Sequence, residues 1–200
     1  MTFLFDIGNV LLNLHFDRFH QAILGAPDTP LPPELMRFRQ PYESGTIDDD
    51  TFVRGSLEVL SSSLSPDQFI SAWQDIFSPN EPMWAVVEQL KAQNHRLILF
   101  SNTNGLHTTS FLSRYRVFDH FDHHHFSQEV KAMKPEAEFY QSAIEQYQLD
   151  PAETLYLDDL PENVAAGRDH GFTSFQYDLN NHQACLEWLA AQKISLVPES

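Results

Sequence analysis

Short runs of apolar residues, each ending at a polar residue, recur along the chain at residues 2–5, 96–100 and 154–157. Continuous apolar runs of this length are typical of parallel strands that are buried on both faces. We expect two further, shorter strands near residues 123–126 and 173–177. Between the strands, apolar residues take helical spacing at residues 83–94, 106–114, 135–148, 161–170 and 180–192. This alternation predicts an α/β fold with a doubly wound, Rossmann-like parallel sheet.

From residue 14 to residue 82 the pattern changes, because strand-like runs give way to helical spacing. Three amphipathic helices are predicted around Phe16–Leu24, around Phe52–Leu60, and around a segment that runs from Phe69 to Phe77. Ser65 and Pro66 are typical of the start of the third helix, and a short fourth helix is expected near residues 34–39. We therefore predict a core domain of residues 1–13 and 83–200 with an inserted all-helical domain of residues 14–82.

Polar groups follow three of the predicted strands directly. Asp6 ends the first run, Ser101, Asn102 and Thr103 end the second, and Asp158 and Asp159 end the third. Lys134 lies between the last two strands. Since the carboxyl ends of parallel strands meet at one edge of a sheet, these side chains are expected to form one site.

The order of these motifs resembles that of the haloacid dehalogenase-like hydrolases, most of which are magnesium-dependent phosphatases. The segments Phe-Asp-Ile-Gly-Asn-Val, Ser-Asn-Thr-Asn-Gly-Leu-His-Thr-Thr and Lys-Pro-Glu-Ala-Glu-Phe-Tyr are most similar to the bacterial α-D-glucose-1-phosphate phosphatase branch. The resemblance covers nearly the whole chain. It implies that the helical insert is a four-helix cap over the active site.

The motifs suggest a division of labour within the site. Asp6 is the candidate nucleophile, because a carboxylate that attacks phosphorus splits hydrolysis into two easier displacements. Lys134 supplies a cation that can bridge the nucleophile and the phosphate. The Ser101 hydroxyl and the backbone amides of Asn102 and Thr103 are expected to bind phosphoryl oxygens.

Asp158 and Asp159 favour a Mg²⁺ cofactor, since magnesium prefers oxygen ligands and carboxylates from separate strands suffice to hold it. The resemblance implies that Asp6, the backbone carbonyl of Gly8 and Asp159 are the direct ligands, with Asp158 behind them. Asn163 stands where relatives often carry another acid, so we expect it to orient ligands or waters.

Gly8 departs from the superfamily pattern, in which a second aspartate two residues after the nucleophile protonates the leaving group and later activates water. The glucose-1-phosphate phosphatase branch shows the same Asp-x-Gly-Asn sequence, and glycine can still offer its carbonyl to a metal. His15, Asn9 or a cap residue are the candidates for replacing the missing acid.

Charge and composition narrow the class of partner. The chain has 12 basic and 28 acidic residues and a net charge of −16, which argues against nucleic acid or an anionic membrane as a partner. Its lone cysteine, Cys185, fits a reducing cytoplasm, and a first strand that begins at residue 2 leaves no room for a signal peptide. We expect a cytoplasmic monomer or weak homodimer that acts on a small phosphorylated molecule.

Several other interpretations remain. A phospho-ligand-binding protein without turnover would also explain Gly8, whereas a metal-free dehalogenase has no need for Asp158 and Asp159. A phosphomutase is disfavoured because it needs the aspartate that Gly8 replaces.

The histidines at positions 120, 123, 124 and 125 favour a solvated strand or loop over a metal site, because consecutive strand residues alternate faces. His107 could contact substrate, pack in the core or cap a helix, and Trp73, Phe77 and Trp84 are expected to pack the cap and its hinge.

Overall fold

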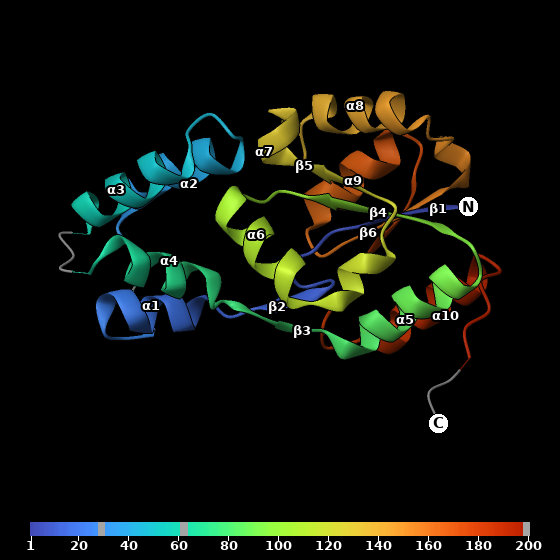
Figure 1. Cartoon of the computed structure of the whole chain (residues 1–200). Helices are drawn as coiled ribbons and strands as arrows, with labels where there is room; N and C mark the ends of the chain where they lie inside the picture. Colours follow the sequence, from blue (N-terminus) through green and yellow to red (C-terminus); the bar gives the residue numbers. More distant parts are fainter. Residues whose placement is uncertain (28–30, 61–63, 198–200) are drawn as a thin grey trace.

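A parallel sheet forms the centre of the molecule in the computed structural model, which describes residues 1–27, 31–60 and 64–197 (Figure 1). In this part of the chain the sheet has five strands in the order β5-β4-β1-β6-β7. The strands are β1 (Thr2–Phe5), β4 (Arg96–Ser101), β5 (His123–Phe126), β6 (Thr154–Asp158) and β7 (Thr173–Gln176). All neighbouring pairs are parallel, and β1 lies between β4 and β6. The predicted doubly wound α/β fold is confirmed.

Helices cover both faces of the sheet, and the pleat of each strand explains why (Figure 1). Phe3 and Phe5 of β1 join one hydrophobic cluster, whereas Leu4 between them joins a second cluster on the opposite face. Helices α5 (Glu81–Ala92), α6 (Gly105–Arg114) and α10 (His182–Ala191) pack into the first cluster. Helices α8 (Ala137–Tyr147) and α9 (Pro161–Asp169) lie on the other face. The continuous apolar runs in the sequence therefore correspond to strands that are buried on both faces.

The segment between the first two motifs is helical. It contains α1 (Phe16–Leu24), the 3₁₀ helix η1 (Pro33–Leu35), α2 (Met36–Glu43), α3 (Asp49–Val59) and α4 (Pro66–Gln74). We call this the helical insert. Its core is a cluster of buried aromatic rings, in which Trp73 packs against Phe19, Phe52 and Phe69 with ring centroids 5.0–6.4 Å apart. Ser65 caps α4 by accepting a hydrogen bond from the Gln68 N–H, as its position before Pro66 predicts.

Two short antiparallel strands, which we call the hinge, join the helical insert to the core. β2 (Leu12–Leu14) pairs with β3 (Phe77–Pro79), so that Leu14 lies opposite Phe77. The prediction of a helix that continues to Phe77 is wrong: α4 ends at Gln74, and Phe77 begins β3. A strand of three residues is too short to show an alternating pattern, and its apolar residue extends the helical spacing by chance.

Smaller elements differ from the sequence prediction at the edges of the core. The third crossover helix, expected from residue 135, begins at Ala137, and a short helix α7 (Ser127–Val130) precedes it. The 3₁₀ helices η2 (Arg116–His120) and η3 (Pro151–Glu153) lead into β5 and β6. The last three residues of the predicted core range, 198–200, lie outside the described residues.

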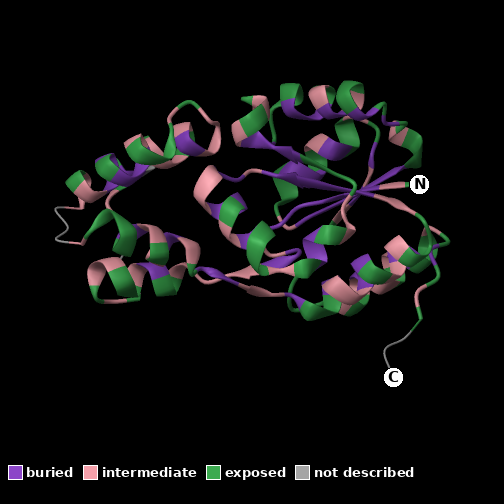
Figure 2. Cartoon of the chain, in the orientation of Figure 1, coloured by how far each residue is buried: buried purple, intermediate pink, exposed green. Residues whose placement is uncertain are grey.

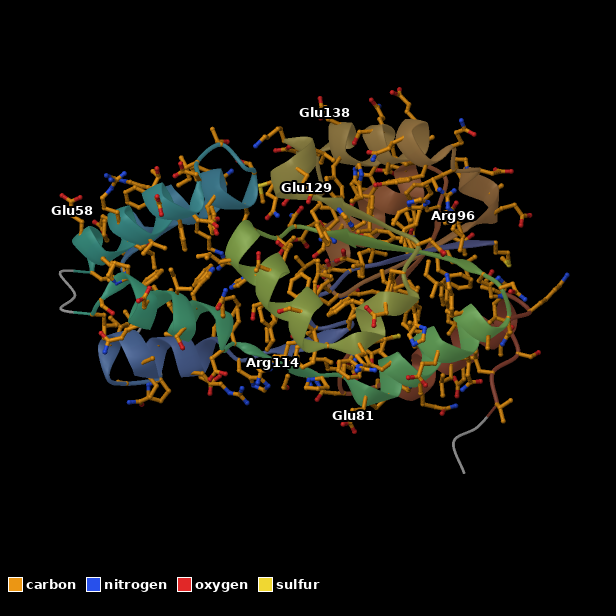
Figure 3. The ribbon with its side chains drawn as sticks, in the orientation of Figure 1. Glu58, Glu81, Arg96, Arg114, Glu129 and Glu138 are labelled. Atoms are coloured by element: carbon orange, nitrogen blue, oxygen red, sulfur yellow. The ribbon has the colours of Figure 1, made fainter. Side chains whose placement is uncertain are left out.

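The buried and exposed residues separate as the layers require. Figure 2 shows buried residues along the strands and on the inward sides of the helices, with exposed residues on the outer surfaces. Figure 3 shows Glu58, Glu81 and Glu138 pointing outward from α3, α5 and α8, where water solvates the excess acidic charge. Within the described residues, no helix combines the length and the apolar character that crossing a bilayer requires.

Candidate active site

The nucleophile candidate Asp6 lies at the carboxyl edge of the sheet, one residue beyond β1. Its backbone N–H donates to the Leu157 carbonyl at 2.9 Å, which continues the parallel ladder with β6 past the end of β1. Its side chain is nearly buried, at 7% exposure for the residue. The sheet therefore fixes the backbone of Asp6 and directs its carboxylate into the space beyond the strand ends.

Lys134 reaches the same point from the loop before α8. Its buried Nζ donates to Asp6 Oδ1 at 2.8 Å, to Asp158 Oδ2 at 2.5 Å and to the Phe100 carbonyl at 2.8 Å. Burial alone would lower the pKa of Lys134, but the adjacent carboxylates of Asp158 and Asp6 outweigh it and raise that pKa above its usual range. The ammonium group is thus held charged, with an acceptor for each of its protons.

Asp158 is fully buried, and both of its oxygens already accept hydrogen bonds. Oδ2 accepts from Lys134 and from the hydroxyl of Tyr156, while Oδ1 accepts from the Leu160 N–H at 2.9 Å and from Asn163 Nδ2 at 3.0 Å. A carboxylate with about four acceptor positions is therefore saturated by protein donors. This geometry favours a role for Asp158 in holding Lys134 and the following turn.

Asp159 differs from its neighbour because it is only half-buried and accepts a side-chain hydrogen bond from Asn9 Nδ2 at 3.0 Å. Burial raises the pKa of Asp159, and the Asp158 charge adds to this rise against the opposing hydrogen bond from Asn9. Its carboxylate retains acceptor capacity that Asp158 lacks.

Three carboxylates converge where a hard cation would bind. Asp6, Asp158 and Asp159 each place one oxygen within 4.8 Å of the others, the sole such convergence of candidate ligands in the described ranges 1–27, 31–60 and 64–197. Burial raises the pKa of Asp6, Lys134 opposes that rise, and Asp158 and Asp159 add to it. One ammonium group does not balance three carboxylates, so the donor set and its charge fit a divalent cation that prefers oxygen.

The candidate phosphate-binding segment follows β4, and one of its side chains is hydrogen-bonded to Lys134. Ser101, the last residue of β4, is buried and lies on the strand beside β1. The side chain of Asn102 pairs with the backbone of Lys134, donating to its carbonyl at 2.9 Å and accepting from its N–H at 2.8 Å. This pair of hydrogen bonds holds the loop that carries Lys134 against the end of β4. The side-chain amide of Asn102 therefore orients Lys134.

Thr103 departs from the sequence expectation. Its backbone N–H, which was expected to bind phosphate, donates instead to Ser127 Oγ at 3.0 Å. The Ser127 hydroxyl also contacts the Glu43 carbonyl at 2.5 Å, at the end of α2 in the helical insert. The Thr103 amide is therefore engaged in joining the insert to the core, which leaves Ser101 and the Asn102 N–H as the candidates for phosphate.

Gly8 lies beside the nucleophile with Leu14 packed over it. A Cβ atom placed on Gly8 would lie 3.0 Å from Leu14 Cδ1 and 3.8 Å from Asp6 Oδ2. The backbone at Gly8 is outside the left-handed region, which is adopted instead by Asn9, with φ of 51°. A side chain at position 8 would therefore begin in close contact with a methyl group of Leu14.

Two of the three candidates for replacing that acid, Asn9 and His15, have other partners in the structure, and a cap residue stays a candidate. Asn9 donates to Asp159 and accepts from the Leu14 N–H, and an amide cannot act as a general acid at neutral pH. His15 Nε2 lies 2.7 Å from Ser78 Oγ in the hinge. The structure gives His15 a partner in β3 rather than in the cluster of carboxylates.

His107 packs between the insert and the core. Its ring stacks on Trp73 with centroids 4.7 Å apart, its Nε2 lies 2.9 Å from the Trp73 carbonyl, and its Nδ1 lies 3.0 Å from Asn104 Nδ2. Burial lowers the pKa of His107 to about 3. The packing interpretation of this residue accounts for its contacts.

Of the four histidines at positions 120 and 123–125, the first ends η2 and the other three belong to β5. His123 and His124 are exposed as expected, but His125 is buried against Phe100 and Phe139. The prediction of a fully solvated segment is therefore wrong at His125, because β5 pairs with β4 and one of its faces packs under α8. Trp84 of α5 packs beside the connection to the helical insert, where its indole N–H donates to the carbonyl of Leu11, just before β2, at 2.7 Å.

Two residues that contact the site directly are not among the site residues that the sequence predicts. Tyr156 donates to Asp158, and strand alternation could have revealed it because Tyr156 and Asp158 are two positions apart on one strand face. Ser127 had no such signal, since its partners Thr103 and Glu43 come from distant segments.

Comparison with known proteins agrees with this geometry. The family model described as haloacid dehalogenase-like hydrolase matches residues 1–171 of the chain. A curated relative, the D-ribitol-5-phosphate phosphatase of Bacteroides thetaiotaomicron, is 24% identical over 185 residues, covering 86% of this chain and 89% of the relative.

Solved structures share the same architecture. A HAD family enzyme from Bacteroides thetaiotaomicron matches with a TM-score of 0.79 at 23% identity, covering 92% of this chain and 97% of that one. A structure described as the wild-type HAD family enzyme of that organism in complex with magnesium and inorganic phosphate matches with a TM-score of 0.77 at 24% identity. It covers 89% of this chain and 94% of that one.

Proposed function

Because the chain belongs to the haloacid dehalogenase-like hydrolases and is an enzyme of that family, we propose that it is a magnesium-dependent phosphatase. It hydrolyses a small phosphomonoester through an aspartyl phosphate at Asp6. The observation that carries this proposal is the contact of one buried lysine, Lys134, with both Asp6 and Asp158 at the carboxyl edge of the sheet. A dehalogenase needs no cation, so the convergence of Asp159 with these carboxylates favours the phosphatase.

In the first step, a carboxylate oxygen of Asp6 forms a bond to phosphorus while the bond from phosphorus to the ester oxygen breaks. The ester oxygen leaves with the electron pair and takes its proton from solvent. In the second step, water attacks the phosphorus of the aspartyl phosphate and loses a proton to solvent, which releases inorganic phosphate and restores the carboxylate. Lys134 holds Asp6 for attack, and Ser101 and the Asn102 N–H orient the phosphoryl oxygens.

The residues that would hold Mg²⁺ are Asp6, the Gly8 carbonyl and Asp159. Asp158 stays behind them because protein donors saturate both of its oxygens. When bound, the cation supplies charge that offsets the repulsion between the Asp6 carboxylate and a phosphate dianion.

The substrate class follows from the resemblance and from the relative. A sugar phosphate such as glucose 1-phosphate, or a polyol phosphate such as the D-ribitol 5-phosphate named for the relative, fits a small phosphomonoester. The helical insert would act as the cap that selects among these. We further propose a cytoplasmic location, because the lone cysteine of the chain fits a reducing compartment.

A second candidate function is phosphate-ester binding without turnover. Gly8 favours it, because glycine cannot supply the acid that assists both steps in most relatives, and Leu14 packs against this position. The Asp6–Lys134 contact favours turnover, since a binding protein gains little from a carboxylate directed at the phosphate.

Turnover assays separate these functions. Purified protein is incubated with a panel of sugar and polyol phosphates, and phosphate release is measured with Mg²⁺, with a chelator, and after Mg²⁺ is restored. We expect release with Mg²⁺, loss in chelator and recovery. Full activity in chelator would contradict the role of the cation, and binding without release across the panel would support the second function.

A further inference from the structure

Asn9 joins two parts of the molecule that are far apart in the sequence. Its side-chain Nδ2 donates to Asp159 Oδ2 at 3.0 Å, and its Oδ1 accepts from the Leu14 N–H at 3.3 Å. Its backbone N–H donates to the Leu12 carbonyl at 2.7 Å and closes a tight turn. One amide therefore contacts both the half-buried carboxylate of Asp159 and the strand from which the helical insert leaves.

The two contacts fix the orientation of the amide. The Leu14 N–H is a donor and must face the amide oxygen, so the amide nitrogen must face the acceptor Asp159. A carboxylate at this position could not donate to Asp159, and a hydroxyl group would be too short to reach both partners. Among residues with a side chain, asparagine is also one of the few that tolerate the left-handed backbone found here, with φ of 51°. Both the side chain and the backbone conformation of Asn9 therefore suit these two hydrogen bonds.

The contact with Asp159 matters because Asp159 is the less restrained of the paired carboxylates. Asp158 accepts hydrogen bonds from a lysine, a tyrosine, a backbone N–H and an asparagine, whereas Asp159 accepts one side-chain bond, from Asn9. Hydrogen bonds to metal-ligating carboxylates orient them, and their loss typically weakens metal binding about 10–100-fold.

The contact with Leu14 matters because Leu14 belongs to the hinge. Leu14 pairs with Phe77 across β2 and β3, and its side chain lies over Gly8 beside the nucleophile. One amide therefore links Asp159 to the strand that carries this leucine.

We infer that Asn9 is a positioning residue that holds Asp159 for the cation and couples cation binding to the hinge strand β2. The inference rests on the proposed function, in which Asp159 is a ligand of Mg²⁺. Because coupling free energies are reciprocal, cation binding stabilises the Asn9–Leu14 contact as much as that contact stabilises cation binding.

The test uses the full chain and Mg²⁺ alone as the probe. Asn9→Gly keeps the left-handed backbone but removes both side-chain bonds. We expect titration calorimetry to show Mg²⁺ binding weakened about 10-fold or more. We also expect Mg²⁺ to slow hydrogen exchange at the Leu14 N–H in the wild type and to leave it unchanged in the variant.

Asn94→Gly is the matched control. Asn94 is also an asparagine with a left-handed backbone, at φ of 60°, but it lies exposed in the turn between α5 and β4. We expect wild-type Mg²⁺ affinity and wild-type exchange at Leu14 in this variant.

Asn9→Asp separates the two contacts, because it keeps an acceptor for the Leu14 N–H but loses the donor to Asp159. Here we expect Leu14 to be protected to the same degree with and without Mg²⁺. Wild-type Mg²⁺ affinity together with Mg²⁺-dependent exchange in the Gly or Asp variant would overturn the inference. If the wild type itself bound no Mg²⁺, the proposed function would fail instead, so the two failures are distinct.

Discussion

The two sides of Asp6 are built in opposite ways. On one side, Lys134 donates hydrogen bonds to the candidate nucleophile Asp6, to Asp158 and to the Phe100 carbonyl. Tyr156 and Asn163 also donate to Asp158, which completes a buried network. On the other side, Gly8 has no side chain and the methyl group of Leu14 takes the adjacent space. Charge is preorganised on the first side, whereas position 8 on the second side carries no acid or base.

This difference indicates which part of catalysis the protein supplies. A fixed ammonium group and fixed carboxylates stabilise and orient charge, which is the largest contribution in many enzymes. General acid–base assistance is typically worth about 10²–10⁴-fold in rate. We therefore expect a site that forms the aspartyl phosphate readily when the leaving group is good and hydrolyses it slowly.

The largest expected effect comes from removing the proposed nucleophile, Asp6. Asp6→Asn keeps the shape of the side chain but cannot form an acyl phosphate, so turnover should fall about 10⁴-fold or more. Phosphate release measures this loss, and an unchanged circular dichroism spectrum controls for folding. Turnover near the wild-type rate would exclude Asp6 as the nucleophile.

The next effect breaks the charged side of the comparison. Lys134→Met leaves Asp6 and Asp158 buried without their cation, which should lower the free energy of unfolding by about 3–5 kcal/mol. Urea unfolding in metal-free buffer measures it. Lys91→Met is the control, because Lys91 forms an ion pair of 2.5 Å with Asp122 at the surface and should contribute less than about 1 kcal/mol. Equal losses in both variants would contradict the structural role of Lys134.

A third effect adds the missing function to the other side. Gly8→Asp restores a carboxylic acid, and the backbone there tolerates a side chain if Leu14 moves by a few tenths of an ångström. We expect the rate for esters with poor leaving groups to rise about 10²-fold, with little change for phenolic phosphates. Leu14→Ala combined with Gly8→Asp relieves the close contact. A wild type whose rate-limiting chemistry shows no dependence on leaving-group pKa would mean that another residue already acts as the acid.

The smallest effect concerns the start of α6, next to the phosphate-binding segment. Burial lowers the pKa of His107 to about 3, below its usual 6.5. The buried, neutral His107 contributes its full stabilisation of the folded chain above pH 6.5. This stabilisation is lost as the pH falls towards 3, because the histidine of the unfolded chain binds a proton that the folded chain does not. The loss is up to about 1.4 kcal/mol per pH unit. Unfolding free energies between pH 7 and pH 5 should fall less steeply in His107→Gln, and equal slopes would contradict this account.

The sequence predicts the charged side of the site better than the glycine side. Asp6, Ser101 and Asp158 lie at or just beyond the ends of apolar runs that form adjacent strands, so the rule that parallel strands end at one edge brings them together. Lys134 comes from a loop, and the motif rather than any local pattern indicates its place.

Contacts between distant segments set the limit of prediction. The engagement of the Thr103 N–H by Ser127, and the packing of Leu14 over Gly8, depend on how the hinge and the helical insert dock on the core. No periodicity in the sequence encodes such contacts. For the same reason Phe77 continues a helical pattern in the sequence although it forms β3 with Leu14. The exact limits of the cap domain stay a prediction.

Trapping the covalent intermediate tests the central claim most directly. Wild-type protein is mixed with Mg²⁺ and a phenolic phosphate, quenched in acid within the first turnovers, and digested for mass spectrometry. Because the first step is preorganised and the second lacks a base, we predict that a large fraction of the peptide containing Asp6 carries one phosphoryl group, and that none does in Asp6→Asn. Phosphate release in a burst-free reaction with no phosphoryl group on that peptide would contradict the account.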